Sequence, residues 1–303
     1  MRIITKTMRI PNCLTAAWLL LGVPLLLAAE PVPPVAAEVV TAAEHGEANA
    51  QFQVARACLR GEGMPKDVNK AYILMKAAAD QGHADAMGGL GYFYSVGEVV
   101  SKDEKLAAEW FRKGAVKGSA KAQLNLGKLL LAEKTGGDGA EKLRAEGVQW
   151  IKQAADQGLA DAGLAYGNIL YFGDHGVARD YAKAAPYLTT AAMHGLAEAQ
   201  NCLGVMNEYG MGMPRNIAAA EPLYRQAALK GNAKAQSNLG ALLNPQNANH
   251  ETRIEALAWL MIASSLREIT AVKLLRDVTP GIEQGDLEAV NKRVSELQKL
   301  IEQ

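Results

Sequence analysis

The chain has no excess of charge and few aromatic residues. Its 32 basic side chains are matched by 32 acidic ones, and aromatic residues make up only 6% of the sequence. Domains that bind nucleic acid carry a clustered excess of Lys and Arg, so nucleic acid is not expected as a partner. The low aromatic content, together with abundant Ala and Gly, favours short helices that pack closely through small residues.

The sequence also lacks the motifs of common catalytic and metal sites. It contains no G-x-S-x-G, S-x-x-K or phosphate-loop pattern. The sequence has five histidines, including His175, and no two of them have the spacing that two metal ligands on one helix would have. We therefore predict no catalytic residue, no metal site and no cofactor, and we expect that the protein is not an enzyme.

The N-terminal segment has the pattern of an export signal. Residues 1–29 carry three bases and no acid, and an apolar run extends from Cys13 to Ala29. This pattern predicts a secretory signal peptide, cleaved after Ala29 or Ala37, and a periplasmic or secreted protein. The alternative is an uncleaved membrane anchor, but the run is short for a membrane span. Residues 30–44 are rich in Pro and Ala and predict a flexible spacer.

An alanine recurs at a nearly constant distance through the rest of the chain. The six copies are Ala50, Ala86, Ala122, Ala162, Ala199 and Ala235, with spacings of 36, 36, 40, 37 and 36 residues. Each opens a stretch with apolar residues three and four apart, which is the pattern of one helix face. A glycine turn then leads to a second such stretch. Since neither helix can bury its apolar face alone, copies of the pair must stack.

The second helix of each pair is marked at both ends. Its predicted N-caps are Asp67, Asp103, Asp180, Asn216 and Thr252, and we favour this interpretation over a row of metal ligands. Its predicted terminal glycines are Gly82, Gly118, Gly158, Gly195 and Gly231. Pro186 and Pro222 fall within two of these helices, which must either kink or begin after the predicted cap.

Four further features depart from the repeat or accompany it. The third copy has a connecting loop, residues 134–147, that is four residues longer than the others. The recurrent Gln51, Gln123, Gln200 and Gln236 predict a structural role. Cys58 and Cys202 lie four copies apart, too far for the roughly 7 Å Cα separation that a disulfide needs, so we expect two small buried apolar residues. The sixth copy is degenerate, and residues 268–303 predict two helices that cap the array.

The pattern A-x-A-Q-x-x-L-G, G-x-G with Asp or Asn, K-A-x-x-W/L and A-A-x-x-G resembles the Sel1-like repeat, a relative of the tetratricopeptide repeat. The resemblance covers residues 45–267 in five clear copies and one weak one. It implies an all-α fold, a right-handed α-solenoid of helical hairpins whose first helices line a concave groove. It also implies a protein-binding adaptor, of a kind that bacteria often export for envelope signalling, assembly or host contact.

Aligned positions on the first helices then give the candidate binding surface. Positions six, nine and ten residues after the opening alanine are expected to face the groove. The candidate partner-binding residues are Arg56, Tyr92, Lys128, Asn168, Tyr171, Phe172, Glu208 and Tyr209. Aromatic and Arg side chains dominate protein-binding hot spots, so the mixture suits a protein or peptide partner.

The function that follows is an exported adaptor that holds a protein or peptide in its concave groove. Contact with a membrane is expected only through an uncleaved N-terminal segment. Two alternatives remain open at this point. One is an envelope hydrolase or penicillin-binding enzyme built on a repeat fold. The other is a structural subunit of a secretion, polymer-export or motor complex.

Overall fold

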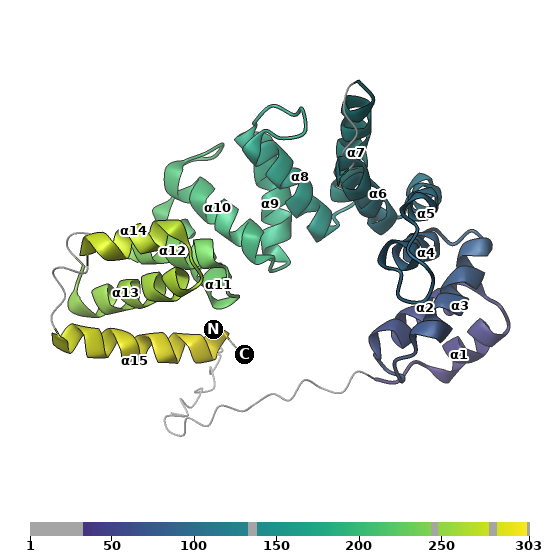
Figure 1. The fold of residues 1–303 in the computed structure, drawn as a ribbon, viewed down its shortest axis with the longest axis horizontal. Helices are drawn as coiled ribbons and strands as arrows, with labels where there is room; N and C mark the ends of the chain where they lie inside the picture. The colour runs from purple at the N-terminus through teal and green to yellow at the C-terminus, as the bar shows by residue number, and fades with distance from the viewer. Residues whose placement is uncertain (1–32, 133–137, 244–247, 279–283, 302–303) are drawn as a thin grey trace, which may run out of the picture.

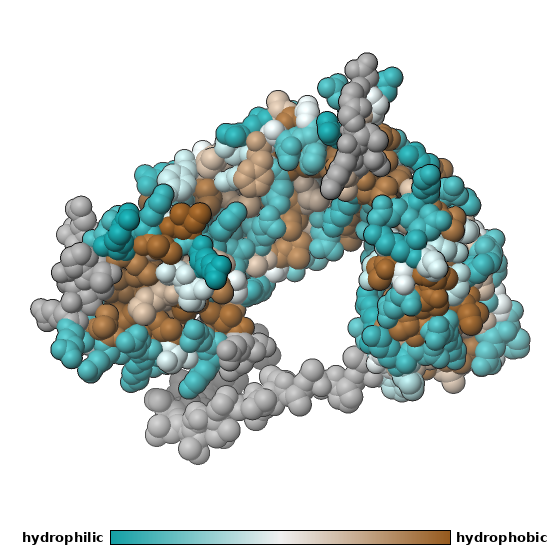
Figure 2. Space-filling model, viewed as in Figure 1, coloured by the Kyte–Doolittle hydropathy of each residue, from teal (hydrophilic) through white to brown (hydrophobic). Residues whose placement is uncertain are grey.

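The computed structural model describes residues 33–132, 138–243, 248–278 and 284–301, and this part of the chain is entirely helical. The helices follow one another along a curved array that leaves an open hollow between its two ends (Figures 1 and 2). They are α1 (Ala37–Glu44), α2 (Ala48–Arg60), α3 (Val68–Asp80), α4 (Ala84–Val96), α5 (Glu104–Val116), α6 (Ala120–Ala132), α7 (Asp138–Asp156), α8 (Ala160–Phe172), α9 (Tyr181–Met193), α10 (Ala197–Tyr209), α11 (Ile217–Leu229), α12 (Ala233–Leu243), α13 (His250–Ser265), α14 (Ile269–Val278) and α15 (Gln284–Ile301).

The predicted solenoid of helical hairpins is confirmed. From α2 to α13, each even-numbered helix pairs with the odd-numbered helix that follows it, and each hairpin packs on the next. The predicted caps Asp67, Asp103, Asp180 and Asn216 accept a hydrogen bond from the backbone N–H three residues on. Thr252 was the wrong choice for the sixth hairpin. Asn249 caps α13 instead, and the N–H of Thr252 is its donor.

Five of the six hairpins close where a large side chain of the second helix lies over a glycine of the first helix. A Cβ atom added to Gly204 would lie 2.6 Å from the ring of Tyr224, which is fully buried. The same relation joins Gly91 to Phe111, Gly127 to Ile151, Gly167 to Leu188 and Gly240 to Leu260. The missing side chain therefore lets the two helices approach more closely than any other residue would allow.

The recurrent glutamines join four of the six hairpins to the helix before them. Nε2 of Gln123, Gln200 and Gln236 donates to the backbone carbonyl eight residues earlier, near the end of the preceding second helix, at 3.1–3.2 Å. Gln200 also donates to Oε1 of Gln226 at 2.8 Å. These side chains are buried, so each bond satisfies polar groups that would otherwise lose their water. The predicted structural role of the glutamines is confirmed.

The spacer predicted over residues 30–44 was wrong for its last eight residues, which form α1. This helix stands where the second helix of a preceding repeat would stand. Gln51 donates to the carbonyl of Ala43, as the later glutamines do to their preceding helices, and Gly46 ends α1 with a positive φ of 92°. Ala43 is buried against α2, so burial of its small apolar face overrides the spacer-like composition. The predicted signal peptide, residues 1–29, lies outside the described residues.

Two other features of the second helices were left open or misread. Pro186 and Pro222 lie inside α9 and α11, which begin directly after the Asp180 and Asn216 caps, so neither helix starts late. The extra residues of the third repeat were predicted as loop, but most of residues 138–147 are helical. They extend α7 to 19 residues, where its counterparts α3, α5, α9 and α11 have 13.

The C-terminal end begins as a seventh repeat and then stops. Ala271 lies 36 residues after Ala235 and is fully buried, and its N–H is capped by Glu268 at 2.7 Å. Arg267 takes the left-handed conformation of the usual glycine, with a φ of 63°. Arg276 stands at the position of Gly240 in this register, and its side chain is 79% exposed. A second helix could not pack over an arginine, so α14 ends the regular array.

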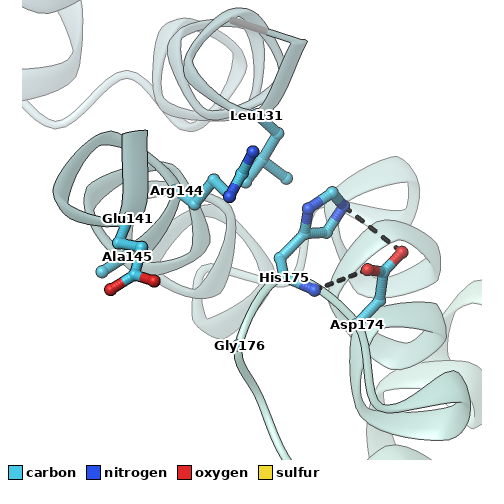
Figure 3. Close-up of a pocket in the computed structure, with 7 residues that line it drawn as sticks. All are labelled: Leu131, Glu141, Arg144, Ala145, Asp174, His175 and Gly176. Carbon is cyan, nitrogen blue, oxygen red and sulfur yellow. Dashed lines mark hydrogen bonds and ion pairs between the residues drawn. The ribbon is translucent and has the colours of Figure 1, made fainter. Parts of the chain in front are cut away.

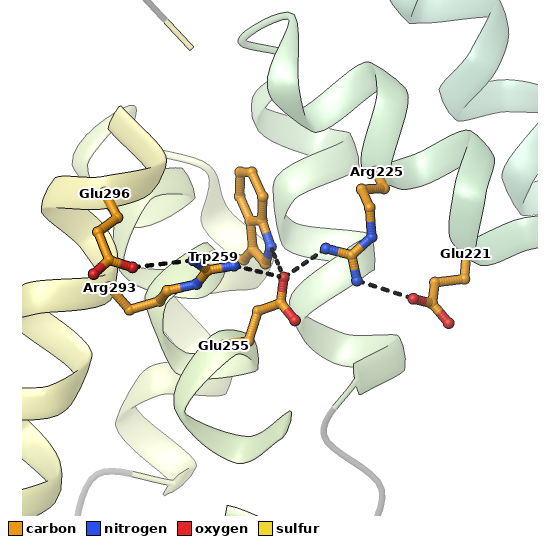
Figure 4. Close-up of polar contacts among 6 residues, drawn as sticks. All are labelled: Glu221, Arg225, Glu255, Trp259, Arg293 and Glu296. Atoms are coloured by element: carbon orange, nitrogen blue, oxygen red, sulfur yellow. Dashed lines mark hydrogen bonds and ion pairs between the residues drawn. The ribbon is translucent and has the colours of Figure 1, made fainter. Parts of the chain in front are cut away.

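Helix α15 completes the cap by packing back against α13 and α11. A polar network reinforces this contact (Figure 4). Glu255 of α13 accepts from Arg225 of α11 at 2.5 Å and lies 3.5 Å from Arg293 of α15. Burial acts to raise the pKa of Glu255, but the hydrogen bond and charge of Arg225 outweigh it and lower the pKa. The carboxylate is therefore more stable in the folded protein than in the unfolded chain.

The glycine contact gives a prediction with a matched control. Gly204→Ala should destabilise the protein by about 1–3 kcal/mol, because the new methyl group displaces the buried ring of Tyr224. Gly139→Ala, in the exposed start of α7 with no atom near the added methyl, should be neutral or stabilise by up to about 1 kcal/mol. Urea denaturation followed by circular dichroism measures both. Equal effects of the two substitutions would contradict the role of the glycine.

The cap network gives a prediction with a pH dependence. Glu255→Gln should cost about 2 kcal/mol of unfolding free energy at pH 7, because it removes the charge that pairs Arg225 and Arg293. Since the pKa of Glu255 is lowered on folding, its contribution is present above the unfolded value of about 4.3. This contribution is lost as the pH falls through the lower pKa that Glu255 has in the folded protein.

The difference between wild type and Glu255→Gln should therefore shrink between pH 5 and pH 3. Glu288→Gln, on the exposed side of α15, is the control and should change stability by less than about 0.5 kcal/mol. A difference that stayed constant down to pH 3 would rule out the ion-pair explanation.

Candidate functional site

The eight predicted binding residues lie on five first helices, but they differ in how available they are. Phe172, Tyr92 and Tyr209 keep 54%, 46% and 67% of their surface exposed, and Arg56 and Lys128 are also exposed. Arg56 lies over the ring of Phe52 on its own helix. These five side chains can meet a partner without rearrangement.

Two of the predicted residues are engaged within the protein. Glu208 accepts a hydrogen bond of 2.7 Å from the hydroxyl of Tyr224, whose burial and bond to Glu208 raise its pKa. Tyr171 packs edge-to-face on Phe172 and Tyr181, and burial raises its pKa to about 12. In this structure both side chains already make contacts within the protein.

The structure brings three of the predicted residues together. Lys128 of α6 and Asn168 and Phe172 of α8 line a pocket of about 250 Å³ between the third and fourth repeats. Its remaining walls are mainly apolar, with Leu131, Ile151, Ala165 and Ile169 among them. Asn168 is held in place by donating to Glu198 of α10 at 2.8 Å. Arg56, Tyr92 and Tyr209 belong to other units and do not join this pocket.

A second, larger cleft of about 760 Å³ continues from the first. The two share Leu131, Asp174 and His175, and the larger one adds Glu141, Arg144, Ala145 and Gly176. Figure 3 shows Arg144, on α7, and His175, on the connection between α8 and α9, reaching into the cleft from opposite sides. The side chain of Glu141 lies on the far side of Arg144 from His175.

His175 is held in an uncommon conformation. Its φ of 52° is left-handed, which costs a residue other than glycine about 1 kcal/mol or more. Oδ1 of Asp174 accepts from the backbone N–H of His175 at 2.6 Å, and Oδ2 lies 3.6 Å from Nε2 of its ring. Asp174 thus orients the imidazole at the edge of the cleft.

Sequence reasoning missed Arg144, His175 and Asp174 as binding residues. A signal for them was nevertheless present. The 40-residue and 37-residue spacings show that the third and fourth repeats each depart from the regular length. The structure places both departures beside the same cleft: the extension of α7, residues 138–143, contributes Glu141 and leads directly into Arg144, and the eight-residue connection between α8 and α9 carries His175.

The described part of the chain offers little support for a metal site, a reactive cysteine or a membrane-spanning helix. No group of three or more His, Cys, Asp or Glu side chains there could hold a metal ion. Cys58 and Cys202 are buried and unpaired, and burial raises the pKa of each thiol, that of Cys202 to about 11. None of the described helices is long and apolar enough to cross a membrane.

The repeat units correspond to a known family. The Sel1 repeat matches residues 48–83, 84–119, 120–159, 160–196 and 197–232, which together span the hairpins from α2 to α11. The protein belongs to the Sel1 repeat family. The hairpin of α12 and α13 lies beyond the matched residues, although it keeps the buried glutamine and glycine of the other Sel1 repeats. Sel1 repeat proteins generally mediate protein–protein interactions.

Solved structures share this arrangement. A protective antigen present in uropathogenic Escherichia coli strains, with an SLR fold, superposes with a TM-score of 0.71 at 25% identity, over 87% of this chain and 56% of the antigen. A Sel1 repeat protein from Oxalobacter formigenes gives a TM-score of 0.60 at 29% identity, over 73% of this chain and 89% of its own.

A longer relative is similar in sequence. An uncharacterized protein of Neisseria meningitidis serogroup B is 30% identical over 173 residues, which is 57% of this Sel1 repeat chain and 34% of the relative. The match therefore spans about a third of the length of that relative.

Proposed function

We propose that this protein is an exported adaptor that binds a protein partner at the surface between its third and fourth repeats. The observation that carries the proposal is the convergence of Lys128, Asn168 and Phe172 on one pocket. Lys128 and Asn168 occupy the same position on two neighbouring first helices, and Phe172 lies one turn further along α8. Together they offer a cation, an amide and an exposed aromatic ring. Such a mixture of polar groups around an apolar anchor suits a protein interface.

The location of the adaptor is inferred from its N-terminal sequence. Residues 1–29 have the basic and apolar segments of a secretory signal. The similarity to a protective antigen present in uropathogenic Escherichia coli strains supports an exported role. We therefore place the adaptor in the periplasm or outside the cell.

The chemistry of the described residues favours binding over catalysis. Nucleophilic catalysis by cysteine requires a thiolate, whereas burial raises the pKa of both Cys58 and Cys202. The alternative of a structural subunit would use the same surface. It would differ from an adaptor in forming a complex of fixed stoichiometry.

Mutation of the pocket should remove the partner without unfolding the array. In a pull-down from envelope extract, Phe172→Ala and Lys128→Ala should each reduce recovery of the partner at least tenfold, because both side chains line the pocket. The control is Met193→Ala, which truncates an exposed apolar side chain outside the pocket, on α9 (82% exposed). It should leave recovery unchanged. Circular dichroism checks that each variant is folded. Full recovery by both pocket variants would refute the proposed site.

A further inference from the structure

The larger cleft has a cationic centre that the fold does not use. Among the described residues, neither Arg144 nor Lys128 has an ion-pair partner, whereas other bases of the third and fourth repeats, such as Lys152 and Lys183, do have one. Arg144 and His175 point toward one another across the cleft (Figure 3). An arginine left unpaired beside a cavity is suited to bind a carboxylate, because its planar fork can donate two parallel hydrogen bonds.

The two acidic residues of the cleft lie outside the space between Arg144 and His175 (Figure 3). Asp174 already accepts from the backbone of His175 and orients its ring. Glu141 lies on the other side of Arg144 from the imidazole (Figure 3). A single carboxylate therefore fits between Arg144 and His175, whereas the flanking Glu141 and Asp174 would repel a long acidic run.

The smaller pocket adds a second requirement. It opens into the cleft through the shared Leu131, Asp174 and His175, and its walls are mainly apolar. The exposed ring of Phe172 lies at this pocket. An apolar side chain bound there would lie close to a carboxylate held by Arg144, so one extended segment could fill both spaces.

We propose that the cleft recognises an internal segment of a partner protein in which one acidic residue neighbours a large apolar residue. The acidic side chain binds between Arg144 and His175, and the apolar side chain enters the pocket of Leu131 and Phe172. This proposal rests on the proposed adaptor function and specifies the partner that it takes. The carboxylate is that of a side chain, and a chain-end carboxylate beside an apolar side chain is the alternative that the experiment separates.

Three pools of bead-bound octapeptides test the proposal. One pool fixes Glu-Leu at its centre, the second fixes Gln-Leu, and the third places Gln-Leu before a free C-terminal carboxylate; all other positions are randomised. The fluorescently labelled full-length protein should bind the Glu-Leu pool at least tenfold more than the Gln-Leu pool. Arg144→Gln should abolish this preference, and Arg276→Gln, which removes an exposed charge on α14, should preserve it.

Each other result has a defined meaning. Equal binding of the Glu-Leu and Gln-Leu pools, or a preference that survives Arg144→Gln, would overturn the acidic requirement and leave the adaptor function standing. Binding of the third pool alone would replace the internal acid with a chain end and overturn the proposal as well. If wild type binds no pool and the pocket variants also retain the partner in pull-downs, both this proposal and the proposed function fail.

Discussion

The array depends on the close approach of two helices within each hairpin. A glycine of the first helix lies directly beneath a large side chain of the second, as Gly204 lies beneath Tyr224. The first repeat has Ala55 at this position, and Met75 stands where Phe111 stands in the second repeat. Ala55 and Met75 are buried in one apolar cluster, and methionine is an unbranched, flexible side chain that adapts more easily. Arg276 occupies the same position in α14, and the regular array ends there. One contact thus decides both how a repeat closes and where the repeats stop.

The contacts between repeats are equally regular, and this regularity leaves little room for specificity. The buried glutamines and N-caps perform the same task in unit after unit. Features that are specific to one repeat occur where the length of the unit changes. The extension of α7 adds Glu141 beside the cleft, directly before Arg144, and the longer connection before α9 adds His175. Both changes leave the glycine contacts of their hairpins intact, at Gly127 and Gly167, so the site could diversify without loss of the fold.

Periodic features were predictable from the sequence because each copy repeats the same local signal. The hairpins, four of the caps and the glutamine role follow from spacing alone. Helix α1 was missed, although Ala42, Ala43 and Gly46 repeat the A-A-x-x-G ending of the other second helices. The surroundings of Arg144 and the partner of Glu208 were not predictable. The first depends on whether an insertion forms helix or loop, and the second on the reach of Tyr224 across its hairpin.

The central claim is that the scaffold and the binding site are separable, and one deletion tests it most directly. Removing His175 shortens the connection between α8 and α9 to the seven residues found between α10 and α11. The dissociation constant of the recovered partner is then measured beside thermal unfolding. The account predicts cooperative unfolding as in wild type and at least tenfold weaker binding. Unchanged affinity in the folded variant would contradict it.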